Sequence, residues 1–309
     1  MTLYKPKFWN RKYSVFAIVL LPFSYILQLF LYFKKTLITK YFFNIPLICV
    51  GNIYVGGTGK TPTSIEIFKI LKKLKKNPVI LKKKYLNHFD EEILIKKKTG
   101  NLITNKSRKS GVKYAEKLGF KSVVLDDGFQ DFSINKDLEI LCFHGNQLLG
   151  NGFTLPSGPL RENLNSIRRA KIIIINGKKN KNFESKIRKI SSQISIYYSN
   201  YMPMNIKQFK KDNFYAFAGI GNPENFFEIL IKNRIKVKKK KYFPDHHIYS
   251  KADIVKMIDA AKKENLRLLT TEKDFLRIKK LGLKNFKYLS VKLNIEKKNQ
   301  LIKEIKKYI

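Results

Sequence analysis

The chain has 309 residues, enough for one large domain or two moderate ones with buried cores. It carries 63 Lys and Arg residues against 23 Asp and Glu, a net charge of +40, and its 44% hydrophobic content excludes a disordered basic tail. The charge fits a lysine-rich composition, and it also fits an anionic partner: a phosphorylated lipid, an anionic membrane or a nucleic acid. Charge alone does not choose between them.

An uncharged stretch of 18 residues, 16–33, lies between two basic segments near the N-terminus. As one helix it would be about 27 Å long, just enough to cross a bilayer core. We therefore expect residues 1–40 to form a hydrophobic membrane-anchoring helix. A proline and two polar residues dilute the stretch, so a helix that lies in the membrane interface is the alternative to a spanning one. A helix buried in the protein core is a further alternative, and a cleaved signal peptide is disfavoured because a small-residue cleavage site is missing.

From residue 45 onwards, short apolar runs alternate with lysine-rich stretches of helical pattern. This alternation predicts an α/β fold, in which helices cover both faces of a mostly parallel sheet. The polar stretch 177–213 separates two such units, so we expect an α/β domain over 41–200 and a smaller one over 201–309. Strands are expected at 46–51, 77–81, 122–127, 138–143, 171–176, 214–220, 266–272 and 288–293, and helices from Pro62, at 110–118, 223–231 and 250–264.

Two residue types in these segments suggest no site of their own. Cys49 and Cys142 lie in apolar, strand-like runs and form no spaced cluster, which argues against a disulfide framework or a zinc site and fits a reducing cytosol. We expect both to be buried core residues. The lysine runs 82–84, 96–98 and 238–241 are interpreted as solvated faces.

The segment 50–62, VGNIYVGGTGKTP, follows an apolar strand and leads into a helix, which is the context of a P-loop. Its glycines let successive backbone N–H groups face a phosphate, its lysine reaches the β- and γ-phosphate oxygens, and its second threonine ligates Mg²⁺. The strict spacing places glycine where the chain has Tyr54, so the loop is a variant. The expected nucleotide-binding residues are Gly56, Gly57, Thr58, Gly59, Lys60 and Thr61.

The segment 122–131, SVVLDDGFQD, is an apolar strand that ends in Asp126 and Asp127. Acids at this place suit a Walker-B role, in which they hold Mg²⁺ beside the P-loop threonine. The guanine-reading order N-K-x-D does not occur, and TEKD at 271–274 does not fit it, so ATP is favoured over GTP. These features indicate a phosphotransferase with a P-loop kinase-like sheet between helices, using ATP and Mg²⁺.

Six motifs occur in a fixed order: VGNIYVGGTGKTP, DDGFQ, GNGFTLPSGPLRE (150–162), FAGIGNPENFF (217–227), FPDHH (243–247) and TEKD (271–274). With them the chain closely resembles the tetraacyldisaccharide 4′-kinase family, the lipid A 4′-kinases of Gram-negative bacteria, nearly from end to end. The resemblance implies transfer of the γ-phosphoryl group of ATP to the 4′-hydroxyl of a tetraacylated glucosamine disaccharide 1-phosphate, giving lipid IVA. It also implies two α/β domains, the smaller closing an active-site cleft, at the cytoplasmic face of the inner membrane. The expected partners are this lipid and the anionic membrane surface, with no specific nucleic acid.

The resemblance also assigns catalytic roles. The family's base is an aspartate in a G-D-E-P-like motif, oriented by a histidine of a D-H-H-like motif. The matching segment here is HFDEEILI (88–95), which makes Asp90 the candidate base and His246 its partner. The family's Gly and Pro are replaced in this segment, so Glu91 and Glu92 remain alternatives. For His246, the alternatives are a metal site or a cap of the following helix.

Further roles follow in the same way. Lys60 is expected to neutralise charge on the transferred phosphate. The family's Ser-Arg-Gly-Tyr-type loop reads KKKY here, at 82–85. Glu162, at the end of GPLRE, matches a family acid near the metal, so the expected metal ligands are Thr61, Asp126, Asp127 and Glu162.

Two other functions remain open at this point. One is a membrane-associated P-loop ATPase that binds an anionic partner, motivated by the net charge of +40. The other is a lipid-binding relic without catalytic activity, motivated by the altered segment 82–92. Transfer of phosphate to a lipid acceptor distinguishes the kinase from both.

Overall fold

The computed structural model describes residues 6–11, 13–85, 89–245, 247–283 and 285–309. They form two compact units. The larger unit contains Pro6 to Lys84, Thr99–Asn200 and Ile295–Ile309, and the smaller contains Tyr85–Lys98 and Tyr201–Asn294. The chain thus passes between the units at residues 84, 98 and 294 as well as at 200, and no shift in composition marks those three points.

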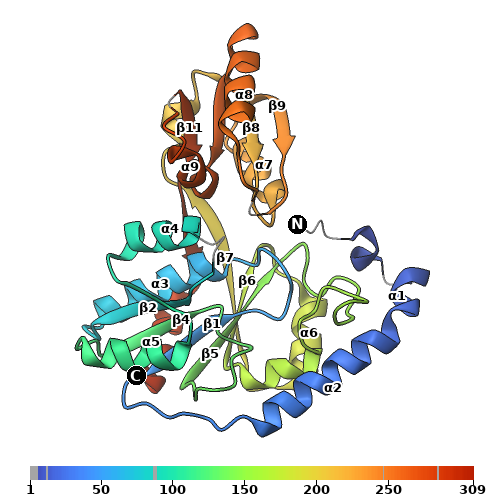
Figure 1. The fold of residues 1–309 in the computed structure, drawn as a ribbon, viewed down its shortest axis with the longest axis vertical. Helices are drawn as coiled ribbons and strands as arrows, with labels where there is room; N and C mark the ends of the chain where they lie inside the picture. Colours follow the sequence, from blue (N-terminus) through green and yellow to red (C-terminus); the bar gives the residue numbers. More distant parts are fainter. Residues whose placement is uncertain (1–5, 12, 86–88, 246, 284) are drawn as a thin grey trace. The chain divides into compact units, whose positions relative to one another are not determined.

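The larger sheet has eight strands in the order β12-β7-β6-β5-β1-β4-β2-β3 (Figure 1). Neighbours from β7 to β3 are parallel, which confirms the predicted α/β class with a mostly parallel sheet. Its strands are β1 Leu47–Gly51, β2 Pro78–Lys83, β3 Leu102–Asn105, β4 Ser122–Asp126, β5 Leu138–His144, β6 Ile172–Asn176, β7 Ser195–Pro203 and β12 Val291–Ile295.

Helices cover this sheet because their apolar faces need a partner. Figure 1 shows α3, which packs on β1, β2 and β4, and α5, which packs on β2 and β3. Beneath α5, the core is built from strand residues such as Leu47, Val79 and Leu125, together with Val112 and Ala115 of that helix. The helices of the larger unit are η1 Lys7–Asn10, α1 Val15–Val19, α2 Leu21–Leu37, α3 Lys60–Lys73, α5 Arg108–Lys117, η2 Leu164–Arg169, α6 Lys181–Ile190, α10 Lys298–Ile305 and η4 Lys306–Tyr308.

The smaller unit is built on a parallel four-stranded sheet in the order β11-β10-β8-β9. Alternate residues of β8 serve two cores, because side chains of a strand point to opposite faces. Phe214 and Ala216 pack with the apolar residues of α7, and Phe217 packs with those of α8. Its elements are α4 Phe89–Thr99, η3 Ile206–Phe209, β8 Asn213–Ala218, α7 Pro223–Lys232, β9 Lys236–Tyr242, α8 Lys251–Lys263, β10 Arg267–Thr271, α9 Glu272–Lys279 and β11 Phe286–Leu289.

The single membrane-anchoring helix predicted within residues 1–40 is not found. The apolar stretch is divided at Leu20 between α1, of five residues, and α2, of 17 residues. Pro22 explains the break, because its ring nitrogen has no N–H to continue the hydrogen bonds of α1. In the part of the chain that the structure describes, every helix is too short or too polar to cross a bilayer.

Some strands differ from their prediction. The strand expected at 288–293 is interrupted at Ser290, and its two halves, β11 and β12, belong to different sheets. The lysines at 238–241 are exposed, as expected, but they lie in β9, an edge strand that the sequence analysis did not predict. Lysine on an edge strand is a common protection against pairing with other chains, so this run fits a strand as well as a solvated loop.

The two cysteines provide a simple test of the core. Cys49 on β1 and Cys142 on β5 are free and buried, as predicted, and burial raises the pKa of each thiol to about 12. Because the thiolate is the reactive form, we expect neither to react with DTNB in the folded protein at about pH 8. Both should react after unfolding in guanidinium chloride. Prompt release of thionitrobenzoate by the native protein would contradict this burial.

Candidate functional site

The glycine-rich loop lies between β1 and α3, in the strand–loop–helix context that the sequence predicted. Gly56 and Gly59 have φ of 122° and 92°, values that glycine adopts without strain. Inside the loop, the buried side chain of Asn52 donates from Nδ2 to Thr58 Oγ1 at 3.0 Å. The loop is therefore shaped by its own polar contacts, and it leads directly to Lys60 at the start of α3.

Asp126 ends β4 and lies opposite Val50 of β1 in the parallel register. Its buried carboxylate accepts hydrogen bonds from Thr61 Oγ1 at 3.2 Å, Ser64 Oγ at 2.8 Å and Lys82 Nζ at 2.9 Å. The fold thus brings together two of the four residues predicted to bind Mg²⁺, Thr61 and Asp126, from segments 65 residues apart.

Lys82 is a residue of this cluster that the sequence analysis missed. Its interpretation as part of a solvated lysine run is wrong: its exposed fraction is only 3%, and it pairs in register with Asp126 across β2 and β4. One feature of the sequence could have indicated that Lys82 is buried. It directly continues the apolar run 78–81, and another strand of the same sheet ends in two acids. Lys84, two residues on, is exposed.

Replacing Lys82 by methionine tests whether this ion pair supports the fold. We expect the free energy of unfolding to fall by about 3 kcal/mol, because Asp126 would stay buried without its cation. The matched control is Lys84→Met, which should change it by less than about 0.5 kcal/mol. Urea unfolding followed by circular dichroism gives both values, and equal small effects would show that the pair contributes nothing to stability.

Asp127 faces two cations, Lys60 of the glycine-rich loop and Arg161 of the 150–162 segment. Its Oδ1 lies 3.8 Å from Lys60 Nζ and 3.1 Å from Arg161 Nη1. Burial by itself would raise the pKa of Asp127, but the positive charges of Lys60 and Arg161, and those of Lys82 and Arg108, outweigh burial and lower this pKa below its usual value. Asp127 is therefore a carboxylate at neutral pH, as a metal ligand must be.

Glu162, the fourth predicted metal ligand, is engaged by protein donors. Its carboxylate accepts from both terminal nitrogens of Arg169, at 2.8 and 3.0 Å, and from Gln130 Nε2 at 3.1 Å. Gln130 in turn accepts from Arg161 at 3.3 Å. A metal ion would have to compete with the Arg169 pair, and the ligand role of Glu162 stays a prediction.

The donor set around Thr61 suits Mg²⁺ in chemistry. Hydroxyl and carboxylate oxygens are the ligands this ion prefers, and Thr61, Asp126 and Asp127 supply them beside Lys60. Within the described ranges, no three acidic, histidine or cysteine side chains are grouped so that they could hold a metal by themselves. Such a site fits an ion that takes its remaining ligands from nucleotide phosphates and water.

In the smaller unit, α4 places the candidate base among cations. Asp90 is 3% exposed, and its Oδ2 lies 2.7 Å from Arg277 Nη2 and 3.7 Å from Lys273 Nζ. Glu91 forms its own ion pair with Lys273 at 2.7 Å. Glu92 is half-buried, so Asp90 is the most enclosed of the three acids that the sequence left as candidates.

His246, the predicted partner of Asp90, lies outside the described residues. Its neighbour His247 stacks on Phe243, with ring centroids 4.6 Å apart, and meets Tyr249 edge-on at 4.8 Å. Burial lowers the pKa of His247, although Asp253 and Asp274 act in the opposite direction. The second histidine of FPDHH is thus a neutral packing residue of the aromatic core.

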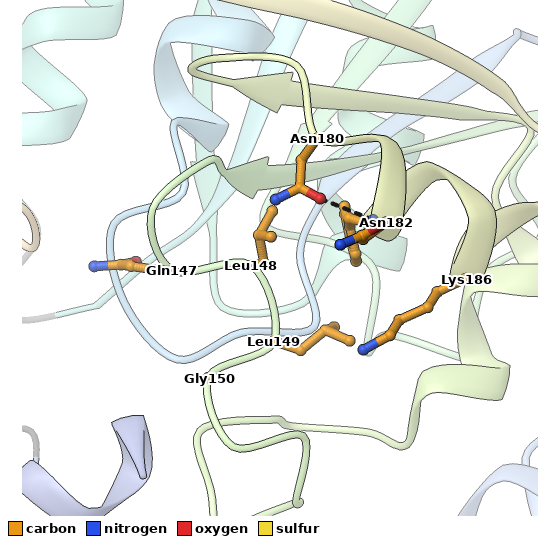
Figure 2. A pocket seen from close by; sticks show the side chains of 8 residues that line it. Gln147, Leu148, Leu149, Gly150, Asn180, Asn182 and Lys186 are labelled. Carbon is orange, nitrogen blue, oxygen red and sulfur yellow. Dashed lines mark hydrogen bonds between the residues drawn. The ribbon is translucent and has the colours of Figure 1, made fainter. Parts of the chain in front are cut away.

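A pocket of about 290 Å³ lies elsewhere in the larger unit, between the 147–150 turn and the start of α6. Figure 2 shows Asn180 there, whose Oδ1 accepts a hydrogen bond from the N–H of Phe183 at 2.9 Å and so caps α6. Lys186 is the one charged residue of its lining. None of the predicted site residues lines this pocket, and we assign it no part in the chemistry.

Comparison with known proteins gives matches over nearly the whole chain. A family model described as tetraacyldisaccharide-1-P 4′-kinase matches residues 16–309. The chain is 42% identical over 311 residues to the tetraacyldisaccharide 4′-kinase of Pelagibacter ubique (strain HTCC1062), which covers 99% of this chain and 98% of the relative. The enzyme of that name from Rickettsia typhi (strain ATCC VR-144 / Wilmington) is 31% identical over 319 residues, covering 97% of each chain.

The fold agrees with these matches. The crystal structure of the "apo" form of LpxK from Aquifex aeolicus in complex with ATP is similar, with a TM-score of 0.73 and 27% identity, and covers 94% of this chain and 99% of that chain. The resemblance drawn from six ordered motifs is therefore confirmed at the level of the whole sequence and of the fold. This chain belongs to the tetraacyldisaccharide-1-phosphate 4′-kinase family.

Proposed function

We propose that this protein transfers the γ-phosphoryl group of ATP to the 4′-hydroxyl of a tetraacylated glucosamine disaccharide 1-phosphate, in lipid A biosynthesis. The observation that carries the proposal is the meeting of the glycine-rich loop with the acids at the end of β4, in a chain of this kinase family. The ATP-bound Aquifex relative supports ATP as the phosphoryl donor.

The loop supplies the groups that a triphosphate needs. The first turn of α3 presents backbone N–H groups and the positive end of the helix dipole to the phosphates. Lys60 adds a full charge, and it is already oriented toward Asp127 at 3.8 Å. Mg²⁺, when bound, would neutralise charge on the β- and γ-phosphates. Thr61, Asp126 and Asp127 would hold it, directly or through water.

The acceptor hydroxyl needs a group to take its proton, and we assign this role to Asp90. A sugar hydroxyl is a weak nucleophile, and a positioned carboxylate that accepts the proton during attack accelerates the step. The burial of Asp90 and its contacts with two cations hold this carboxylate in place. Most of the rate enhancement should still come from positioning and from charge neutralisation around the transferred group.

The lipid substrate and the inner membrane also require an apolar surface, and α1 and α2 provide one. Large apolar side chains on these helices are exposed, among them Phe16, Phe23, Ile26 and Phe30, and lysines follow in the last turn of α2. This combination is typical of helices that lie in the interface of an anionic membrane. The proposed location is therefore the cytoplasmic face of the inner membrane of a Gram-negative bacterium.

The opposite side of α2 is hydrogen-bonded to the 154–161 segment of the same unit. Ser24 is buried and hydrogen-bonds Ser157 Oγ at 2.9 Å and the carbonyl of Thr154 at 3.0 Å, and Gln28 reaches the carbonyl of Arg161 at 3.4 Å. The helix that carries the proposed membrane surface is thus hydrogen-bonded to the loop that contributes Arg161 to the nucleotide site.

The proposed function is tested by radiolabelled phosphate transfer from γ-³²P-ATP to tetraacyldisaccharide 1-phosphate, with purified protein in detergent micelles. We expect a labelled product with two phosphates that depends on both substrates and is lost when EDTA removes divalent cations. ATP hydrolysis without labelled lipid would support the membrane-associated ATPase instead. Neither hydrolysis nor transfer would support the relic without activity.

A further inference from the structure

The TEKD segment, 271–274, is a family motif for which the proposed function gives no role. Its aspartate, Asp274, is fully buried at the start of α9, and Thr271 caps this helix by accepting from the N–H of Asp274 at 3.1 Å. The carboxylate of Asp274 accepts from the N–H of Gly219 at 2.9 Å, Thr271 Oγ1 at 2.7 Å and Tyr249 Oη at 3.0 Å. These donors come from three separate segments, so Asp274 is a fixed point of the smaller unit.

Arg277, one turn further along α9, connects this fixed point to Asp90. Its Nη1 donates to Asp274 Oδ1 at 2.9 Å and to the carbonyl of Gly219 at 2.6 Å, and its Nη2 donates to Asp90 Oδ2 at 2.7 Å. The guanidinium is planar, so the two hydrogen bonds donated by Nη1 also fix the direction in which Nη2 points. The 187-residue separation of Arg277 and Asp90 in sequence explains why no local pattern indicates the contact.

Of the two described cations beside Asp90, Arg277 is the nearer, at 2.7 Å. Lys273 is farther away, at 3.7 Å, and its nearer contact is Glu91 at 2.7 Å. A buried carboxylate is costly unless it is paired and hydrogen-bonded. Burial would lower the pKa of Arg277, but Asp274 and Asp90 together raise it, so the guanidinium keeps its charge.

We propose that Arg277, anchored by Asp274 of the TEKD motif, is the positioning residue that orients the Asp90 carboxylate for proton acceptance. This inference rests on the proposed role of Asp90 as base. A general base must lie within hydrogen-bond reach of the proton, and small misplacements of reacting groups cost large factors in rate. The hydrogen-bonded series Gly219–Asp274–Arg277–Asp90 supplies this precision from the end of β8 and the start of α9.

The test compares Arg277→Met, Arg277→Lys and Asp90→Asn in the phosphate-transfer assay, with full-length protein. Arg277→Met should lower kcat about 10²-fold and change KM for ATP less than about twofold. Arg277→Lys keeps the positive charge but loses the planar guanidinium with its several N–H donors, and it should lower kcat about 10-fold. The control Arg267→Met removes an exposed arginine of the same unit, paired only with Asp212 at 3.2 Å among its described contacts, and should be neutral.

The pH profile of kcat separates positioning from general stability. Loss of the Arg277 charge should raise the pKa of Asp90 and move the acid limb of the profile upward by about one pH unit. Lys273 and Glu91, charged residues near Asp90 in the described part of the chain, remain in every variant, with Asp245 beside Lys273, so they do not account for a difference. Arg277→Lys should leave the acid limb where it is.

A double-mutant cycle decides the inference. If Arg277 acts through Asp90, the Asp90→Asn/Arg277→Met variant should turn over within about twofold of Asp90→Asn. A further loss of 10-fold or more in the double variant, or an unchanged kcat in Arg277→Met, would overturn the positioning role while leaving Asp90 as the base. If Arg277→Met does not fold, Arg277→Lys with and without Asp90→Asn decides by the same comparison.

The same assays distinguish a failure of the proposed function from a failure of the positioning role of Arg277. If the wild type transfers no phosphate, the kinase assignment fails before any variant is compared. If the wild type is active and Asp90→Asn is equally active, the base lies elsewhere and the inference about Arg277 falls with it.

Discussion

Replacing Lys60 by alanine is expected to lower the rate of phosphoryl transfer by about 10³-fold, which is only about 4 kcal/mol of transition-state stabilisation. Lys60 begins α3 and its ammonium group lies 3.8 Å from Asp127. A lysine in this place stabilises the negative charge that develops on the β- and γ-phosphates in the transition state. The rate should be measured in single-turnover reactions with excess enzyme, so that product release does not hide the change.

Two variants serve as controls for Lys60→Ala. Lys72→Ala removes an exposed lysine from the last turn of the same helix, and it should leave the rate unchanged. Lys60→Arg keeps the charge but changes the shape of the group, and we expect it to lose most of the activity. A Lys60→Ala protein with near-full rate would overturn the assignment of this loop as the phosphate site.

Several strands of the larger sheet could be predicted because each is a short, continuous apolar run, as strands buried on both faces are. β1, β4 and β6 appear within one residue of the expected start or end. The position of Asp126 beside the glycine-rich loop also follows from sequence, because an acid at the end of a parallel strand lies at the same edge as the loop after its neighbour.

The rest depended on contacts that no local pattern contains. In the sequence, Lys82 is one of three consecutive lysines. Only the register of β2 with β4 shows that it is buried against Asp126. Arg277, which donates a hydrogen bond to Asp90, lies 187 residues away on α9. The break in the N-terminal apolar stretch is predictable from Pro22, which lacks the N–H that a continuous helix needs at this position.

Replacing Asp90 by asparagine should lower kcat by about 10²-fold to 10⁴-fold, the usual range for removal of a general base. Asparagine has the same shape as aspartate and keeps an oxygen toward Arg277, so the loss would reflect the charge and the proton-accepting ability of the side chain. KM for ATP should change less than about twofold, because the glycine-rich loop is untouched. Initial rates over a range of ATP concentrations separate these two effects.

The acids beside Asp90 provide matched controls, since they occupy the same first turn of α4. Glu91→Gln removes the partner of Lys273, and Glu92→Gln changes a half-buried side chain. Each should retain at least about a third of the wild-type kcat. Thermal unfolding of the variants shows whether the folded state survives, because Asp90→Asn leaves Arg277 with one fewer charge partner. If Glu91→Gln or Glu92→Gln abolishes turnover while Asp90→Asn does not, the base is the neighbouring acid and the substitution of the family's Gly and Pro has shifted the register by one or two residues.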